Sequence, residues 1–231
     1  ILLRADGTSV YITQDIYLSE AKHKEWKFDR SLYVVGMEQE LHFQKLFAIF
    51  DILNFPWAKN STHVSYGWIN LPDGRMKSRT GHVVDADDFL KEIQNLAKEE
   101  IHARGEKPRE KELNARALNI ALGAIKYYIL QVDPKTTIVF DPKKSLSFQG
   151  RTGPYLQYMA VRMQSILEKT PKNILRGEIS YTHFSTKEEH TLIVLIGDFP
   201  EILLKATENY DPSMLGKYLY ELALRSVPHS L

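Results

Sequence analysis

The first third of the chain alternates short apolar runs with stretches of helical periodicity. The pattern predicts a strand at residues 10–13, a helix at 15–26, a strand at 32–35, a helix at 38–53 and a strand at 63–69. A β-α-β-α-β order predicts right-handed crossovers and a parallel sheet, and such sheets bind ligands at the carboxyl ends of their strands. The loops that follow the strands are therefore the places where chemistry is expected.

The rest of the chain reads as mainly helical. Helices are expected from Asp85 or Asp87, as N-caps, and over residues 110–130, with a short strand-like run at 136–140. A further helix at residues 154–168 begins a second, helical domain. Its later helices are expected to begin at a capping box of Ser185 with Glu188, at Asp198 and Pro200, and at Asp211 and Pro212.

Composition removes several kinds of chemistry. The 231 residues include no Cys, which excludes disulfides, thiolate zinc sites and cysteine nucleophiles. No histidine pair has the spacing of metal ligands, so no protein-bound metal is expected. No apolar run approaches the roughly 18 residues of a membrane span, and a cytoplasmic protein without a membrane partner is expected. The chain begins with Ile1 rather than Met, which is typical of a piece of a longer protein.

Residues 74–81 have the groups that bind a polyphosphate. Glycines stand at both ends, two hydroxyls lie between them, and the cations are Arg75, Lys77 and Arg79. Backbone N–H groups and hydroxyls contact phosphate oxygens, and cations neutralise the charge that develops on a leaving group. The spacing is not that of a Walker A loop. A solvated surface loop explains the same residues, and the spacing alone leaves both interpretations open.

Tyr11 and Asp15 are four residues apart at a predicted strand-to-helix junction, so they share one side of a helical turn. A carboxylate beside a phenol suits a cationic ligand, and a planar guanidinium forms a two-bond fork with a carboxylate that an ammonium does not form. A helix cap is the alternative role of Asp15. Gly36 ends the next predicted strand and opens a helix, where free N–H groups face a ligand.

These segments, in this order, resemble the second half of the catalytic domain of class I aminoacyl-tRNA synthetases, specifically the arginyl-tRNA synthetases. The matching phrases are RADGTSVYITQDI (4–16), LYVVGMEQELHFQKLF (32–47), HVSYGWINLPDGRMKSRTGHVV (63–84) and SLSFQGRTGPYLQYMAVRMQSIL (145–167). The resemblance implies an α/β fold class: residues 1–142 are the C-terminal part of a Rossmann-like parallel-sheet catalytic domain, and residues 143–231 are an α-helical, anticodon-binding-like bundle that is incomplete.

The resemblance also implies roles for individual residues. Arginine would be bound by Tyr11, Asp15 and Gln39. ATP would be bound by Gly36, Glu38, His63, Met76 and Ser78, with His42 a further candidate in a matched phrase. The KMSKS-type loop would supply the catalytic cations Arg75, Lys77 and Arg79. Ser78 stands where the general class I pattern has its second lysine, so Lys77 and Arg79 both remain candidates for the missing charge.

An RNA-binding face is expected at the start of the helical domain. Cations stand beside aromatic residues there, a combination that follows phosphates and stacks on unpaired bases: Arg151, Tyr155, Tyr158 and Arg162. Core packing explains the tyrosines equally well. With 30 Lys and Arg against 29 Asp and Glu, the net charge of +1 means that RNA would have to be bound by such a local patch.

The implied reaction is ATP-dependent formation of arginyl-adenylate, followed by transfer of arginine to tRNA(Arg), with Mg²⁺ expected to accompany ATP. The enzyme is expected to be a monomer. No segment of the sequence resembles the HIGH-type motif, which the family has in the N-terminal half of its catalytic domain. The 231 residues alone are therefore expected to be inactive. The alternatives are a non-catalytic RNA-binding or interaction module of synthetase ancestry, and an unrelated nucleotide-binding α/β enzyme that uses the loop at 75–81.

Overall fold

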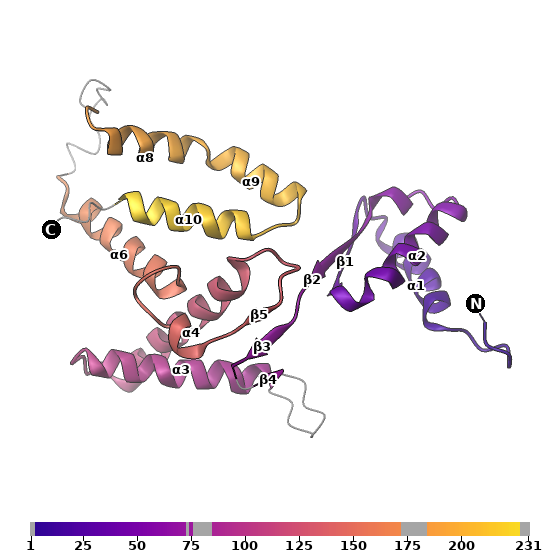
Figure 1. Cartoon of the computed structure of the whole chain (residues 1–231), viewed down its shortest axis with the longest axis horizontal. Coiled ribbons are helices and arrows are strands. Elements are labelled where there is room, and N and C mark those ends of the chain that lie inside the picture. Colours follow the sequence, from indigo (N-terminus) through magenta and orange to yellow (C-terminus); the bar gives the residue numbers. More distant parts are fainter. Residues whose placement is uncertain (1–2, 73, 76–84, 172–183, 227–231) are drawn as a thin grey trace. The chain divides into compact units, whose positions relative to one another are not determined.

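The computed structural model describes residues 3–72, 74–75, 85–171 and 184–226. These residues divide into two compact units, Ile1–Trp68 and Ile69–Leu231 (Figure 1). The first unit holds two parallel strands with their helices, and the second is mainly helical. Each unit is described by itself below.

The first unit is built around a β-α-β crossover. Its elements are α1 (Tyr11–Trp26), β1 (Ser31–Gly36), the 3-10 helix η1 (Met37–Gln39), α2 (Glu40–Ile52), the 3-10 helix η2 (Ala58–Asn60) and β2 (Ser61–Tyr66). β1 and β2 pair in parallel, with Ser31 opposite Ser61 and Gly36 opposite Tyr66. The predicted parallel pair with a crossover helix is therefore confirmed, and both strands end at one edge.

The strand predicted at residues 10–13 is wrong. Val10 is the extended residue that precedes α1, and the helix begins at Tyr11. β-branched and aromatic residues favour strands locally, but packing overrides such propensities. Ile12 and Ile16, one helical turn apart, both pack against the aromatic core of this unit, and only a helix places them together there.

α1 and α2 cover one face of the two strands. On β1 the side chains of Tyr33 and Val35 pack into the core formed by α2 and Trp57, whereas Leu32 and Val34 between them are exposed. Alternate residues of a strand point to opposite faces, so this pattern identifies which face the helices cover. The other face of β1 is apolar and uncovered in the described part of the chain.

The second unit begins with a small sheet and continues as helices. Its elements are β3 (Ile69–Leu71), β4 (Gly74–Arg75), α3 (Ala86–Ala103), α4 (Glu110–Leu130), β5 (Ile138–Val139), α5 (Pro142–Ser145), α6 (Gly153–Lys169), α8 (Lys187–Gly197), α9 (Phe199–Glu208) and α10 (Ser213–Ser226). β3 lies in the middle of the sheet, antiparallel to β4 and parallel to β5.

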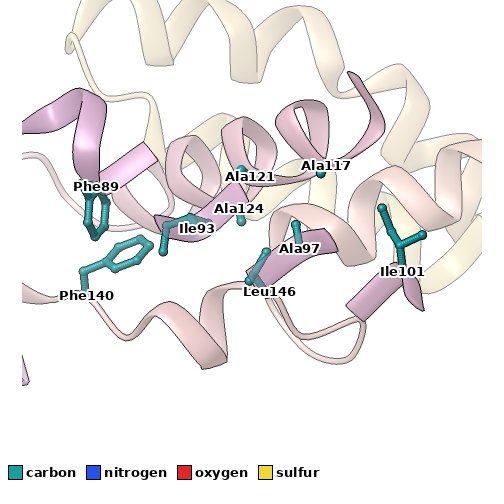
Figure 2. Close-up of a cluster of buried hydrophobic side chains, with 9 residues drawn as sticks. All are labelled: Phe89, Ile93, Ala97, Ile101, Ala117, Ala121, Ala124, Phe140 and Leu146. Atoms are coloured by element: carbon teal, nitrogen blue, oxygen red, sulfur yellow. The ribbon is translucent and has the colours of Figure 1, made fainter. Parts of the chain in front are cut away.

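The core of this unit lies between α3 and α4 (Figure 2). α3 contributes residues one turn apart, and α4 contributes small residues that allow close approach of the two helices: Phe89, Ile93, Ala97 and Ile101 from α3, Ala117, Ala121 and Ala124 from α4. Phe140 lies at one end of this core. Its ring is edge-on to that of Phe89, with 4.9 Å between the ring centroids. The carboxylate of Asp85 accepts a hydrogen bond from the N–H of Asp87 at 2.9 Å, which confirms Asp85 as the N-cap.

In the C-terminal bundle, α10 packs against α6, α8 and α9 (Figure 1). The capping box expected for Ser185 and Glu188 is one residue off. Thr186 and Glu189 form it: the Thr186 hydroxyl accepts from the Glu189 N–H, and the Glu189 carboxylate accepts from the Thr186 N–H. Both pairs have the required spacing in the sequence, so the spacing by itself did not distinguish them.

Gly153, the first residue of α6, touches the backbone of α4. A Cβ on Gly153 would overlap the carbonyl group of Gly123 and lie 2.8 Å from the nitrogen of Ala124. Because backbone cannot move aside as a flexible side chain does, we expect Gly153→Ala to lower the free energy of unfolding by about 1 to 3 kcal/mol in urea titrations. Gly197→Ala, where a Cβ meets nothing within 4 Å, is the matched control. Equal stability of the two variants would contradict the prediction.

Candidate functional site

Asp15 lies inside α1 and points to α2. Val10 precedes the helix without a side-chain cap, and Asp15 lies beyond the first turn, so the helix-cap interpretation of Asp15 is wrong. Its Oδ2 lies 2.8 Å from Nε2 of His42 on α2. The side chain of Asp15 is 37% exposed and that of His42 is 25% exposed. The pair therefore sits at the edge of the α1–α2 packing, where a ligand can reach it.

Tyr11 lies one turn before Asp15 on α1, as the spacing predicts, and the residue is 77% exposed. It contributes to an open pocket of about 540 Å³ between the start of α1 and the middle of α2. The pocket is lined by Val10, Tyr11, Ile12, His42, Lys45, Ala48 and Ile49. His42 thus faces the pocket and contacts Asp15 as well.

Gln39 precedes α2 and is exposed. It stands three residues before His42, a spacing that places both at the amino-terminal end of the helix on neighbouring positions. In the described part of the chain no hydrogen bond joins Gln39 to Tyr11 or Asp15. The structure therefore brings Tyr11, Asp15 and His42 together, and among the described residues it shows no side-chain hydrogen bond of Gln39 with them.

The candidate ATP residues of this unit lie around β1 and β2. Gly36 ends β1 and is buried, and the carboxylate of Glu38 lies so close that a Cβ on Gly36 would be 2.8 Å from its Oε1. Nε2 of His63 lies 2.9 Å from the carbonyl oxygen of Val35. Since a carbonyl only accepts, this nitrogen carries the proton. The His63 ring also packs on Phe43, with 4.4 Å between ring centroids.

The polyphosphate loop, residues 74–81, begins with the two residues of β4. The backbone of Arg75 pairs with Asn70 of β3. Four of the predicted site residues lie outside the described residues: Met76, Lys77, Ser78 and Arg79. Their roles in the loop stay predictions.

The expected RNA-binding residues occupy the start of α6 and the segment before it. Tyr158 is exposed, and the guanidinium of Arg162 lies 5.7 Å from its ring centroid. Tyr155 is half-buried against Met159 and Ala223, and burial raises the pKa of its phenol. Tyr155 is therefore partly packed in the bundle and Tyr158 is exposed, and the RNA-binding role of both stays a prediction.

Arg151 lies 5.1 Å from the ring centroid of Tyr220, which belongs to α10 and packs near Tyr155 at 5.8 Å. Sequence analysis does not find Tyr220, because α10 is distant along the chain and only the bundle brings it beside α6. The sequence likewise assigns His42 to the nucleotide site only, although its spacing from Gln39 places it beside the arginine residues.

Among the residues that the structure describes, no three His, Asp or Glu side chains are grouped as metal ligands. None of the described helices is long and apolar enough to cross a membrane.

Two family models match the chain. The catalytic domain of class I tRNA synthetases of the R type matches residues 1–141. The chain belongs to the class I arginyl-tRNA synthetases. The DALR anticodon binding domain matches residues 156–226 of this synthetase chain. The boundary expected between residues 142 and 143 stays a prediction.

Relatives of the synthetase chain include an arginine–tRNA ligase of Treponema denticola, 46% identical over 231 residues that cover 96% of this chain and 39% of the relative. An arginine–tRNA ligase of Bacteroides thetaiotaomicron is 42% identical over 226 residues, covering 96% of this chain and 38% of the relative. The chain spans about two fifths of the length of the curated relatives that it matches.

The arginyl-tRNA synthetase of Thermus thermophilus has a similar structure, with a TM-score of 0.81, 28% identity, and coverage of 97% of this chain and 41% of that chain. The Plasmodium falciparum arginyl-tRNA synthetase shares the fold at a TM-score of 0.78 and 23% identity, covering 97% of this chain and 38% of that one. The predicted fold class, the C-terminal part of a parallel-sheet catalytic domain followed by helices, is confirmed.

Proposed function

We propose that the protein containing this synthetase chain is an arginine–tRNA ligase. The observation that carries the proposal is the geometry of α1: Tyr11 and Asp15 lie one turn apart, and Asp15 has only His42 as a polar partner among the described residues. A carboxylate without a Lys or Arg partner retains its capacity for a guanidinium. The match to the class I catalytic domain over residues 1–141 supports the same substrate.

The proposed reaction has two steps. The ionised carboxylate of arginine attacks the α-phosphate of ATP, a bond to that phosphorus forms, and the bond to pyrophosphate breaks with its electrons leaving on pyrophosphate. A hydroxyl oxygen of the terminal ribose of tRNA then attacks the arginyl carbonyl carbon and an ester bond forms. The bond from that carbon to the phosphate oxygen breaks, AMP leaves with its electrons, and the hydroxyl proton goes to the phosphate or to solvent. The first step needs no general base and no enzyme nucleophile, so catalysis rests on positioning and on stabilising phosphate charge.

The residues divide these tasks. Tyr11, Asp15 and Gln39 bind arginine. The nucleotide is held by Gly36, Glu38, His63, Met76 and Ser78. The cations of the polyphosphate loop stabilise the departing pyrophosphate. Mg²⁺ belongs to the ATP substrate in this proposal and would supply charge neutralisation at its phosphates.

The proposal extends to tRNA(Arg). Residues 156–226 match an anticodon-binding domain, and Tyr158 with Arg162 presents an exposed ring beside a cation, which suits an unpaired base and its phosphate. We place the enzyme in the cytoplasm, where translation takes place, and propose that it acts as a monomer.

Arginine-dependent ATP–pyrophosphate exchange tests the ligase proposal. We expect exchange by the complete gene product and little by the 231 residues alone, because none of these residues forms the HIGH-type phrase that grips ATP phosphates in the family. Strong exchange by the 231 residues would overturn the expectation of an inactive piece. Absence of exchange in the complete product, with retained binding of tRNA(Arg), would favour the non-catalytic RNA-binding module instead.

A further inference from the structure

The contact between His42 and Asp15 joins two helices that the sequence places far apart. Nε2 of His42 lies 2.8 Å from Oδ2 of Asp15, within hydrogen-bond distance. Among the described residues, neither side chain has another polar partner. Among the described residues of this unit, His42 is therefore the one polar group that sets the orientation of the Asp15 carboxylate.

The hydrogen bond leaves Asp15 able to bind a guanidinium. A carboxylate offers about four lone-pair sites on its two oxygens, so one bond from His42 leaves both oxygens able to accept a two-bond fork. The contact with Nε2 of His42 occupies one lone-pair site of Oδ2, and the other sites of the carboxylate remain available to a cation. What the bond removes is rotation about the Cβ–Cγ bond, and rotation would turn the carboxylate out of the plane that a planar guanidinium requires.

We propose that His42 is a positioning residue for arginine: it holds the Asp15 carboxylate in the plane that receives the substrate guanidinium. The inference rests on the proposed function and adds a residue to its arginine site. His42 also lines the open pocket with Tyr11, so one side chain both borders the pocket and contacts the carboxylate that it orients. Groups that are held by a second layer of hydrogen bonds bind with less loss of conformational freedom.

A purely structural clamp between α1 and α2 is the competing explanation. The apolar contacts of Ile12 and Ile16 with the core that contains Phe43, Leu46 and Phe50 already join the two helices. The His42–Asp15 pair is partly exposed, and ion pairs and hydrogen bonds at such positions contribute little to stability. The packing of the helices therefore does not require the pair, which favours a role in binding.

The test compares His42→Leu, which removes both ring nitrogens, with His42→Gln, which keeps a side-chain N–H donor. In the complete gene product we expect His42→Leu to raise the KM and the Kd for arginine about tenfold, the effect of losing one hydrogen bond to a charged group. The KM for ATP and the kcat are expected to change less than about threefold. His42→Gln should recover most of the arginine affinity. His190→Gln and His190→Leu, at an exposed position of α8, are the matched controls.

The outcomes separate the two proposals. A wild-type protein that neither binds arginine nor catalyses exchange overturns the proposed function itself. If the wild type binds arginine and His42→Leu binds it equally well, the positioning role is overturned and the proposed function stands. The positioning role is also overturned if His42→Leu loses kcat and the affinity for both substrates in parallel. It is likewise overturned if His42→Gln folds but binds arginine no better than His42→Leu.

Discussion

Replacing Asp15 by Asn is expected to weaken arginine binding by roughly 3 to 5 kcal/mol, the cost of removing one partner from an ion pair that bound substrate shields from water. The amide is neutral and cannot accept the two-bond fork of a guanidinium on both of its atoms. ATP affinity is expected to change little, because the Asp15 carboxylate contacts His42 on α2 and the loop cations belong to a different segment.

Calorimetric titration of the complete gene product with arginine and with ATP measures both affinities. Asp51→Asn is the matched control, since Asp51 is an exposed carboxylate of α2 whose side chain has no polar partner among the described residues. An arginine affinity that Asp15→Asn leaves unchanged would remove Asp15 from the substrate site. The His42 contact would then be a link between helices only.

Replacing Lys77 or Arg79 by Ala is expected to lower the turnover number by about 10² to 10³, or roughly 3 to 4 kcal/mol, by analogy with donors aimed at developing oxyanion charge. The KM for ATP should rise much less. Charge on pyrophosphate grows as the bond to the α-phosphate breaks, so a cation there interacts more strongly with the transition state than with bound ATP.

Steady-state kinetics of the two variants in the complete gene product checks this expectation, with Lys111→Ala on the exposed start of α4 as the control for loss of one cation. Because Ser78 replaces the second lysine of the general class I pattern, we expect the two variants to lose turnover unequally. Turnover numbers close to wild type in both would mean that backbone amides perform the chemistry of the loop, or that the loop is a solvated surface segment.

Local patterns predicted most of the elements in this chain. The helical spacing of Ala117 and Ala124 predicted α4, and Asp85 was correctly predicted as a possible N-cap of α3. The prediction of a strand at residues 10–13 failed because the side chains of these residues suit a strand as well as a helix. The helix is favoured only by the burial of Ile12 and Ile16 against the aromatic core, which is a long-range effect.

The sequence by itself determined the parallel β1–β2 pair, the four-residue spacing of Tyr11 and Asp15, and the resemblance to the arginyl-tRNA synthetase family. Only the tertiary structure decided that His42 contacts Asp15 and that Tyr220 lies beside Arg151. The periodicity of apolar residues identifies which face of a helix is buried, but it does not identify the helix against which that face packs. Residues 27 positions apart, such as Asp15 and His42, become neighbours only when the packing of α1 on α2 sets their relative rotation and height.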